Sequence, residues 1–351
     1  MQLHNQIDKK VLEQQLADDS IERITLSLYK YHHLRNPEVF RDHLYTELEK
    51  LGVLGRIELA SEGINGQMSV PKDAFNDFLE FIDTIDFLKD NRLNIAVDDD
   101  GKSFIKLAIR VRSKILADGL TDASFDVTDK GTHLDAKEFN ELTDDPDTVL
   151  IDMRNHYESE VGHFEGAITP DVDTFRDSLS VIEEILEPHK DKNIVMYCTG
   201  GIRCEKASAW YKHRGFDNVH QLNGGIIEYT RQAKEQGLPN KFIGKNFVFD
   251  KRMGERISED VISNCHQCGE SSDTHVNCAN EACHLLFIQC KACQKKHEGC
   301  CCKECTDFIH LPMEKQQELR KEIDFGKSNI YHKGRVRPKL TEELRRKLKS
   351  I

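Results

Sequence analysis

The stretch NIVMYCTGGIRCEKA, residues 193–207, decides the fold of the middle of this chain. A short apolar strand ends at Cys198, a loop with two glycines follows, and a helix begins near Arg203. Cysteine reacts as its thiolate, which backbone N–H groups, a helix N-terminus and a guanidinium all favour. We therefore predict a catalytic Cys198, with an anion- or persulfide-binding loop of Thr199, Gly200, Gly201, Ile202 and Arg203. The alternative is an inert, buried cysteine, which is common among free thiols.

Cys204 lies in the first turn of the predicted helix, close to the nucleophile in sequence. Two roles stay open for it. It would resolve an oxidised or persulfidated Cys198, or it would pack as a small buried hydrophobe.

Three further motifs surround this loop and occur in a fixed order. They are VLIDMRN at 149–155, GHFEGAI at 162–168 and VHQLNGGI at 219–226. Together with the spacing Cys198-x4-Arg203 they resemble the rhodanese family. The resemblance implies an α/β domain with a parallel sheet and a nucleophile at the C-terminal end of a strand. It also implies sulfur chemistry, because the related phosphatases have a loop that is one residue longer.

Composition limits the class of protein. The chain has 351 residues, of which 38% are hydrophobic and 31% are charged, and its formal net charge is −12. This length predicts two or three domains. No apolar run approaches the roughly 20 residues of a membrane span, and the first residues form no apolar signal region. We expect a cytoplasmic protein with no membrane partner and with reduced cysteines; the oligomeric state is left open.

The N-terminal third alternates between strand and helix patterns. Strands are predicted at 24–31, 53–60, 63–70 and 104–112, and helices at 37–51 and 72–85. This β-α-β-β-α-β order predicts a ferredoxin-like domain. The full predicted division is an arm at 1–20, the ferredoxin-like domain at 21–118, a linker at 119–132, the rhodanese-like catalytic domain at 133–240, a Cys-rich, zinc-binding module at 241–310 and a basic tail at 311–351. The polar turn at 60–66 either contacts RNA or the active site, or is a plain turn.

Ten of the 12 cysteines fall between Cys265 and Cys305, which leaves only Cys198 and Cys204 elsewhere. Cys-x2-Cys pairs in a reduced protein have the spacing of zinc ligands. Cys265, Cys268, Cys290 and Cys293 form one predicted set. The second combines Cys278 and Cys283 with two of Cys300, Cys302 and Cys305. A segment of this size needs such a staple. A metal-free thiol cluster, disulfides formed on isolation and an iron–sulfur cluster are the alternatives.

The last 25 residues are basic although the whole chain is acidic. Such a tail contacts phosphates in many nucleic-acid-binding proteins, or it is simply solvated. The candidate RNA contacts are Arg335, Arg337, Lys339, Arg345, Arg346 and Lys347.

The combination of these parts resembles one family closely. An N-terminal ferredoxin-like domain, the sequence YCTGGIRCEKA at 197–207 and the Cys-rich segment with CHLLFIQC at 283–290 are similar to the bacterial tRNA uridine(34) hydroxylases. The resemblance covers about residues 20–310. It implies 5-hydroxylation of the wobble uridine, with molecular oxygen as co-substrate and the tRNA anticodon loop as partner. It also implies that Cys198 is essential and that Asp152 and Arg154 brace its loop.

The chemistry of such a reaction is not fixed by the sequence. No flavin or nicotinamide fingerprint is present, although cofactors usually perform oxygen chemistry. We expect a thiolate or persulfide of Cys198 to add to carbon 6 of uracil and to activate carbon 5. Two other classes stay open: a sulfurtransferase that carries a persulfide, and a zinc-stapled RNA-binding module without catalysis.

Overall fold

The computed structural model describes residues 9–96, 102–249, 252–322 and 346. The chain divides into two compact units. The first contains 1–155, 164–241 and 248–255, and the second contains 156–163, 242–247 and 256–351. In the described part of the chain, every helix is too short or too polar to cross a lipid bilayer.

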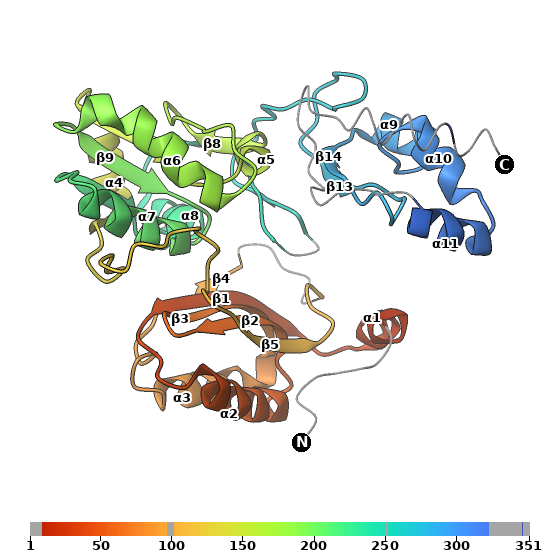
Figure 1. Cartoon of the computed structure of the whole chain (residues 1–351), viewed down its shortest axis with the longest axis horizontal. Coiled ribbons are helices and arrows are strands. Elements are labelled where there is room, and N and C mark those ends of the chain that lie inside the picture. Colours follow the sequence, from red (N-terminus) through yellow and green to blue (C-terminus); the bar gives the residue numbers. More distant parts are fainter. Residues whose placement is uncertain (1–8, 97–101, 250–251, 323–345, 347–351) are drawn as a thin grey trace. The chain divides into compact units, whose positions relative to one another are not determined.

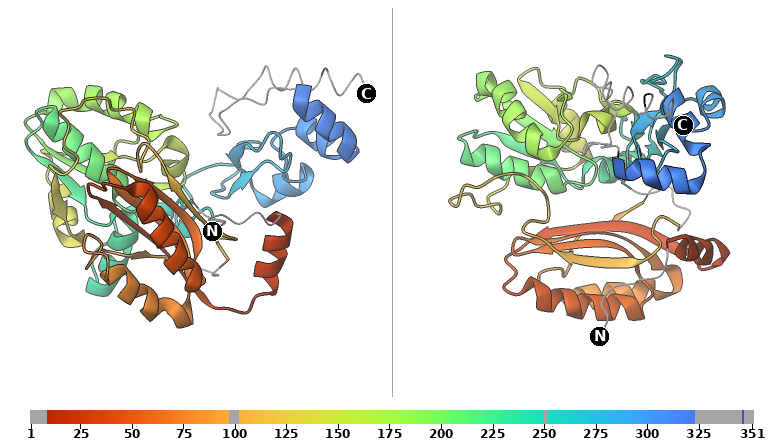
Figure 2. Two further views of the ribbon diagram at one scale, coloured as in Figure 1. Left: turned by 60° about the horizontal axis from the view of Figure 1, so that its bottom comes forward. Right: turned by 45° about the vertical axis from the view of Figure 1, so that its right-hand side comes forward.

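The N-terminal region forms a five-stranded sheet with two helices on one face (Figures 1 and 2). The short helix α1 (Lys9–Asp18) precedes the sheet. The sheet and its helices comprise β1 (Arg23–Tyr31), α2 (Pro37–Lys50), β2 (Leu54–Ala60), β3 (Gly63–Pro71), the 3₁₀ turn Lys72–Ala74, α3 (Phe75–Asp83), β4 (Asn94–Ile95) and β5 (Leu107–Val111). The core between sheet and helices includes Leu28, Leu44, Leu48, Ile57 and Phe78, all at most 1% exposed. This architecture confirms the predicted ferredoxin-like fold.

The strand predicted at 104–112 is present, but it is not the fourth strand of the ferredoxin-like order. The segment predicted as the fourth strand, 104–112, forms β5, which pairs in parallel with β2. The fourth strand is β4, which has two residues and lies at the other edge of the sheet beside β1. A two-residue strand shows no alternation of polar and apolar residues, so the sequence pattern did not reveal it.

The middle region forms a four-stranded parallel sheet in the order β6-β10-β9-β7. Its strands are β6 (Thr132–Leu134), β7 (Thr148–Asp152), β9 (Asn193–Tyr197) and β10 (Val219–Leu222). The helices are α4 (Ala136–Thr143), α5 (His156–Ser159), α6 (Phe175–Leu186), followed by the 3₁₀ turn Glu187–His189, α7 (Ile202–His213) and α8 (Gly225–Gln236). The strands β7 and β9 are apolar and almost wholly buried, as expected for a parallel sheet covered on both faces. The predicted α/β domain is confirmed.

A small three-stranded sheet joins β8 (Gly162–Phe164), β11 (Phe242–Asn246) and β12 (Glu255–Arg256). The Cys-rich region beyond it contains the hairpin of β13 (His275–Asn277) and β14 (Leu286–Ile288), and the helices α9 (Lys291–Lys296), α10 (Lys303–Ile309) and α11 (Met313–Glu322). Cysteines occupy about half of its core, beside Phe287, Phe308 and Leu319. The apolar side chains alone make a small core, which is typical of a module that needs an additional staple.

A buried ion-pair cluster connects the two halves of the first unit. The Lys206 ammonium on α7 lies 2.8 Å from Glu62 in the β2–β3 turn and 2.6 Å from Asp118 in the connection between the sheets. The side chains of Lys206 and Asp118 are 1% and 0% exposed. The polar turn at 60–66 therefore contacts the helix that follows the Cys198 loop.

We predict that Lys206→Met destabilises the chain by about 2–4 kcal/mol, because the substitution leaves Glu62 without its cation and Asp118 with Lys114 as its remaining cation, 2.6 Å away. Urea unfolding of the full chain measures the change. Lys72→Met is the matched control: its ion pair with Glu22 is exposed, with side chains 63% and 74% accessible, and its loss should cost about 0.5 kcal/mol or less. Equal midpoints for the two variants would contradict the buried role of Lys206.

Candidate active site

Cys198 lies in the loop that joins β9 to α7, at the C-terminal end of the parallel sheet. Its side chain has no exposed surface. The Gly201 N–H donates to the Cys198 Sγ at 3.1 Å. Gly201 has φ +101°, a conformation that disfavours other residues, and a Cβ there would lie 2.3 Å from the Tyr29 Oη. The glycine thus allows the backbone to curl around the sulfur.

Arg203 closes the loop from the first turn of α7. Its Nη2 lies 3.4 Å from the Thr199 Oγ1, and the side chain is largely buried. Burial of Cys198 by itself opposes ionisation. The hydrogen bond from the Cys204 thiol, the charge of Arg203 and the backbone N–H groups of Cys204 and Arg203 outweigh this effect and lower the pKa of Cys198 to about 6. The sulfur is therefore mainly a thiolate at neutral pH.

Cys204 is buried against the same sulfur. Burial and the neighbouring Cys198 raise the pKa of Cys204 well above its ordinary value, so it stays a thiol. The two cysteines therefore have opposite protonation states. The Cys204 thiol can therefore donate a hydrogen bond to the Cys198 thiolate. It also lies beside Cys198 as a second sulfur that can be oxidised.

Asp152 and Arg154 support the strand that carries Cys198. Both are fully buried, and Arg154 donates through Nε and Nη2 to the two carboxylate oxygens of Asp152 at 2.9 and 2.6 Å. The Tyr197 hydroxyl donates to the same carboxylate at 2.7 Å. Since Tyr197 directly precedes Cys198, this network fixes the backbone at the start of the loop. Hydrogen bonds of this kind would let Asp152 and Arg154 hold the loop in position, which is the role that the family resemblance implies for them.

A second support comes from the Gly224-Gly225 turn before α8. The N–H of Ile226 donates to the Cys198 carbonyl at 3.0 Å, and the N–H of Ile227 donates to the Thr199 carbonyl at 3.2 Å. A Cβ at Gly225 would lie 2.4 Å from the Cys198 carbonyl oxygen. Only glycine allows this close approach of the two backbones. The sequence motif NGGI at 223–226 therefore holds the backbone of the Cys198 loop in place, a role that its sequence pattern did not reveal.

A pocket of about 400 Å³ lies above the loop. Cys198, Thr199, Gly200, Ile202 and Arg203 line one side of it. The other side is lined by polar residues of the N-terminal sheet and its flanking segments, among them Ser27, Tyr29, Arg56, Asn65, Gln67 and Asn94. A volume of this size suits a small organic ligand or a nucleobase with its sugar.

The N-terminal sheet contacts the loop directly. The Asn94 Nδ2 donates to the Gly200 carbonyl, and the Tyr31 Oη donates to the Ile202 carbonyl, both at 3.3 Å. The Arg92 Nη1 donates to the Asn223 side chain at 2.7 Å. None of these contacts was predicted from the sequence. The available signal was a pair of tyrosines, Tyr29 and Tyr31, which alternate on β1 with the buried leucines of its core face.

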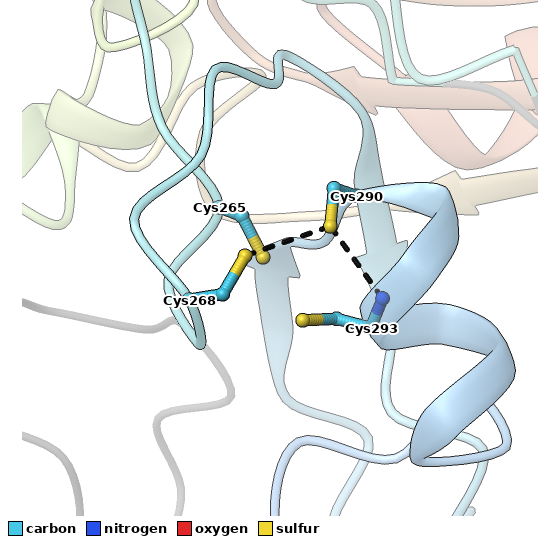
Figure 3. Close-up of side chains that lie close together, drawn as sticks. All are labelled: Cys265, Cys268, Cys290 and Cys293. Carbon is cyan, nitrogen blue, oxygen red and sulfur yellow. Dashed lines mark hydrogen bonds between the residues drawn. The ribbon is translucent and has the colours of Figure 1, made fainter.

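The structure brings eight cysteines of the C-terminal region into two groups of four. The first is Cys265, Cys268, Cys290 and Cys293, as predicted from the spacing (Figure 3). The second is Cys278, Cys283, Cys301 and Cys305. Within each group all four sulfurs lie within 4.8 Å of one another, which is a geometry that can bind a metal ion.

The predicted second set requires a correction. It combined Cys278 and Cys283 with two of Cys300, Cys302 and Cys305. The group contains Cys305 from these three, and its fourth member is Cys301, which was not predicted. The Cys301 Sγ lies 3.7 Å from the Cys283 Sγ and 3.8 Å from the Cys305 Sγ. Three adjacent cysteines precede α10, and neighbouring side chains in such a segment point in different directions. Their spacing to Cys305 therefore does not reveal which of the three faces the group.

The predicted RNA contacts Arg335, Arg337, Lys339, Arg345 and Lys347 lie outside the described residues. Arg346 is described by itself and is exposed. Exposure suits either predicted role, so an RNA contact at Arg346 stays a prediction.

Thiolates absorb in the ultraviolet, and subtraction of the Cys198→Ser absorbance from the wild-type absorbance isolates the signal of Cys198. We predict that this difference titrates with a midpoint near pH 6. Arg203→Gln removes a positive charge and should raise the midpoint, so that at any pH below the wild-type midpoint the thiolate fraction of Cys198 falls by roughly threefold to tenfold. The thiolate fraction rises with pH through the midpoint, so activity that needs it should rise in the same range. A midpoint near that of an ordinary thiol in the wild type would contradict this site.

Three family models match this chain in consecutive segments. They are the UPF0176 acylphosphatase like domain at residues 23–115, the Rhodanese-like domain at 135–232 and the Rhodanase C-terminal domain at 243–306. The solved rhodanese-like domain of an Anabaena sp. protein is 21% identical, covers 32% of this chain and 78% of its own, and has a TM-score of 0.26.

Two curated relatives match over almost the whole chain. The tRNA uridine(34) hydroxylase of Leptospira interrogans is 52% identical over 97% of this chain and 92% of its own length. The tRNA uridine(34) hydroxylase of Yersinia enterocolitica is 56% identical over 91% of each chain. In both relatives, similarity at this level covers at least 91% of this chain. This chain belongs to the tRNA uridine(34) hydroxylase family.

Proposed function

We propose that this chain hydroxylates uridine 34 of tRNA at carbon 5, that molecular oxygen is the co-substrate, and that the Cys198 thiolate is the nucleophile. The observation that carries the proposal is the Cys198 sulfur, which accepts the Gly201 N–H at 3.1 Å and lines, together with Arg203, a pocket large enough for a nucleoside. The lowered pKa of this thiol supports the proposal. The family membership supplies the substrate and the reaction type. A tRNA substrate also favours the cytoplasm, where the cysteines would stay reduced.

The first step uses Cys198 alone. Its Sγ adds to carbon 6 of the uracil ring, and a carbon–sulfur bond forms. The electrons of the carbon 5–carbon 6 double bond move to the oxygen on carbon 4, which gives an enolate. The enolate makes carbon 5 a much stronger nucleophile than it is in the unmodified ring. Arg203 and the loop N–H groups would stabilise the sulfur before attack and after release.

The second part of the reaction must account for both oxygen atoms. The enolate forms a bond from carbon 5 to one atom of molecular oxygen, which places a peroxide on carbon 5. The oxygen–oxygen bond then breaks, so that one atom stays on carbon 5 as the hydroxyl group and the other leaves as water. This balance requires two electrons and two protons, which a pair of thiols supplies when it is oxidised to a disulfide. Loss of the carbon 5 proton and departure of the Cys198 thiolate then restore the ring double bond. Cys204 is a thiol beside the reacting sulfur and is a candidate for one member of the pair. The second member is a thiol of the added reductant, which also reduces the resulting disulfide, because Cys198 is bonded to carbon 6 during this step.

The pocket suits an extruded base. Uracil presents a donor at N3 and acceptors at O2 and O4, and side-chain amides such as those of Asn65 and Gln67 offer both kinds of group. The guanidinium of Arg56 also lines the pocket and suits a phosphate. Bases of a single-stranded anticodon loop can leave the stack at a small cost. These residues are proposed to hold uridine 34 above Cys198.

We predict that Cys198→Ser abolishes 5-hydroxyuridine formation in a reaction of the full chain with unmodified tRNA, oxygen and a thiol reductant. Mass spectrometry of the digested nucleosides measures the product, and ¹⁸O₂ shows whether the hydroxyl oxygen comes from oxygen gas. Cys302→Ser, which changes a cysteine outside the pocket, is the control and should retain the activity. Full hydroxylation by the Cys198 variant would refute the nucleophile.

The persulfide-carrying sulfurtransferase makes the opposite prediction in the same experiment. It would release thiocyanate from thiosulfate and cyanide at Cys198 and leave the tRNA nucleosides unchanged. The non-catalytic RNA-binding module would do neither.

Gly225 offers a test of the loop geometry without a change to any reacting group. We expect Gly225→Ala to reduce hydroxylation at least about tenfold, because the new Cβ would collide with the carbonyls of Cys198 and Thr199 at 2.4 and 2.6 Å. Gly215→Ala is the matched control. Gly215 also has a positive φ, +85°, but its Cβ would meet nothing within 4 Å, so it should cost only about 1–2 kcal/mol of strain. If both variants lose the same activity, backbone strain and not loop displacement is the cause.

A further inference from the structure

We propose that the C-terminal region binds two zinc ions at closed tetrathiolate sites, one at Cys265, Cys268, Cys290 and Cys293 and one at Cys278, Cys283, Cys301 and Cys305. The proposal concerns a region that the proposed hydroxylation does not use. Its failure would leave the proposed reaction at Cys198 unaffected.

Distances between the sulfurs carry the proposal. Zinc–sulfur bonds are about 2.3 Å long, so the four sulfurs of a tetrahedral site lie about 3.8 Å apart. The Sγ atoms of Cys268 and Cys290 are 3.7 Å apart in the first group. In the second group Cys301 lies 3.7 Å from Cys283 and 3.8 Å from Cys305. A disulfide would need about 2.05 Å, and these cysteines are all free.

The first site is built from two turns that face each other. Cys265 and Cys268 lie in a tight turn that the Gly269 N–H closes on the Cys265 carbonyl at 2.9 Å. Cys290 caps the N-terminus of α9, and Cys293 follows in its first turn. Figure 3 shows the four side chains directed toward a common centre. The two Cys-x2-Cys segments are 22 residues apart and meet only through the tertiary fold.

The second site is built from the β13–β14 connection and the start of α10. Cys278 and Cys283 come from the connection, and Cys301 and Cys305 come from the approach to the helix and its first turn. Three of these four cysteines are buried. Four thiolates at this separation would repel one another strongly unless a cation stood between them.

Donors around the sulfurs support the second site independently. The Cys301 N–H points at the Cys278 Sγ at 3.4 Å. The Nδ2 of Asn280, a fully buried side chain, points at the Cys305 Sγ, also at 3.4 Å. Such N–H···S contacts are typical of the surroundings of metal-bound thiolates, because they disperse the negative charge of the ligands.

The donor set selects zinc and a structural role. Four thiolates in a tetrahedron suit a single zinc ion, and they leave no open coordination position for a substrate. A polynuclear iron–sulfur cluster would hold its cysteine sulfurs farther apart, because several iron and sulfide atoms stand between them. The module is also small, its hairpin has two strands, and its helices are short, so metal sites would supply stability that its apolar core lacks.

Metal analysis of the full chain tests the proposal, with zinc, iron and protein measured on one sample. We expect two zinc ions per chain in the wild type and one in each of Cys268→Ser and Cys301→Ser. Cys302→Ser is the matched control next to Cys301, and it should keep two. Fewer than two zinc ions in the wild type, iron in their place, or equal loss from Cys301→Ser and Cys302→Ser would overturn the proposal.

A second measurement covers the case in which the ligand variants fail to fold. Wild-type protein produced in cobalt-containing, zinc-depleted medium should bind two cobalt ions. Its visible spectrum should have the intense d–d and thiolate charge-transfer bands of tetrahedral cobalt with sulfur ligands. Weak bands of six-coordinate cobalt, or no cobalt in the protein, would refute the two sites.

Discussion

The stabilisation of a buried thiolate at Cys198 is the constraint on which the catalytic region depends. Burial opposes the charge, and the loop must overcome that cost with hydrogen bonds and one guanidinium. Each of these groups acts only at short range. The loop therefore has to keep its backbone in one conformation, and the neighbouring structure is arranged to hold it there.

Three supports hold the loop from different directions. The Asp152–Arg154 pair and the Tyr197 hydroxyl fix its start at the end of β9. The Gly224-Gly225 turn leaves no room for a side chain, and the N–H groups that follow it donate to the loop carbonyls. The helix α7 supplies its end, together with Arg203. The nucleophile is therefore positioned by a parallel sheet, a helix N-terminus and a neighbouring turn together.

The N-terminal sheet completes the site. Asn94 and Tyr31 donate hydrogen bonds to the loop, and several polar side chains of the same sheet form the opposite wall of the pocket. The buried cluster of Lys206, Glu62 and Asp118 connects this sheet to α7. Without the N-terminal sheet the loop would lack the opposite wall of its pocket. A pocket with walls on both sides and with polar groups in its lining suits a reaction on one nucleobase.

The local structure around Cys198 and the thiol-rich turns could be predicted from the sequence, whereas the contacts between distant segments could not. The apolar run before Cys198, the glycines and Arg203 specified a strand, a tight loop and a helix, because these depend on contacts within a few residues. The Cys-x2-Cys pairs specified thiol-rich turns in the same way. Only the tertiary structure decided that Cys301, and not Cys300 or Cys302, joins Cys278 and Cys283. It also decided that Asn94, Tyr31 and Gly225 contact the loop. Those choices depend on which side chains face one another across strands and helices that are distant in sequence, and local spacing carries no information about them.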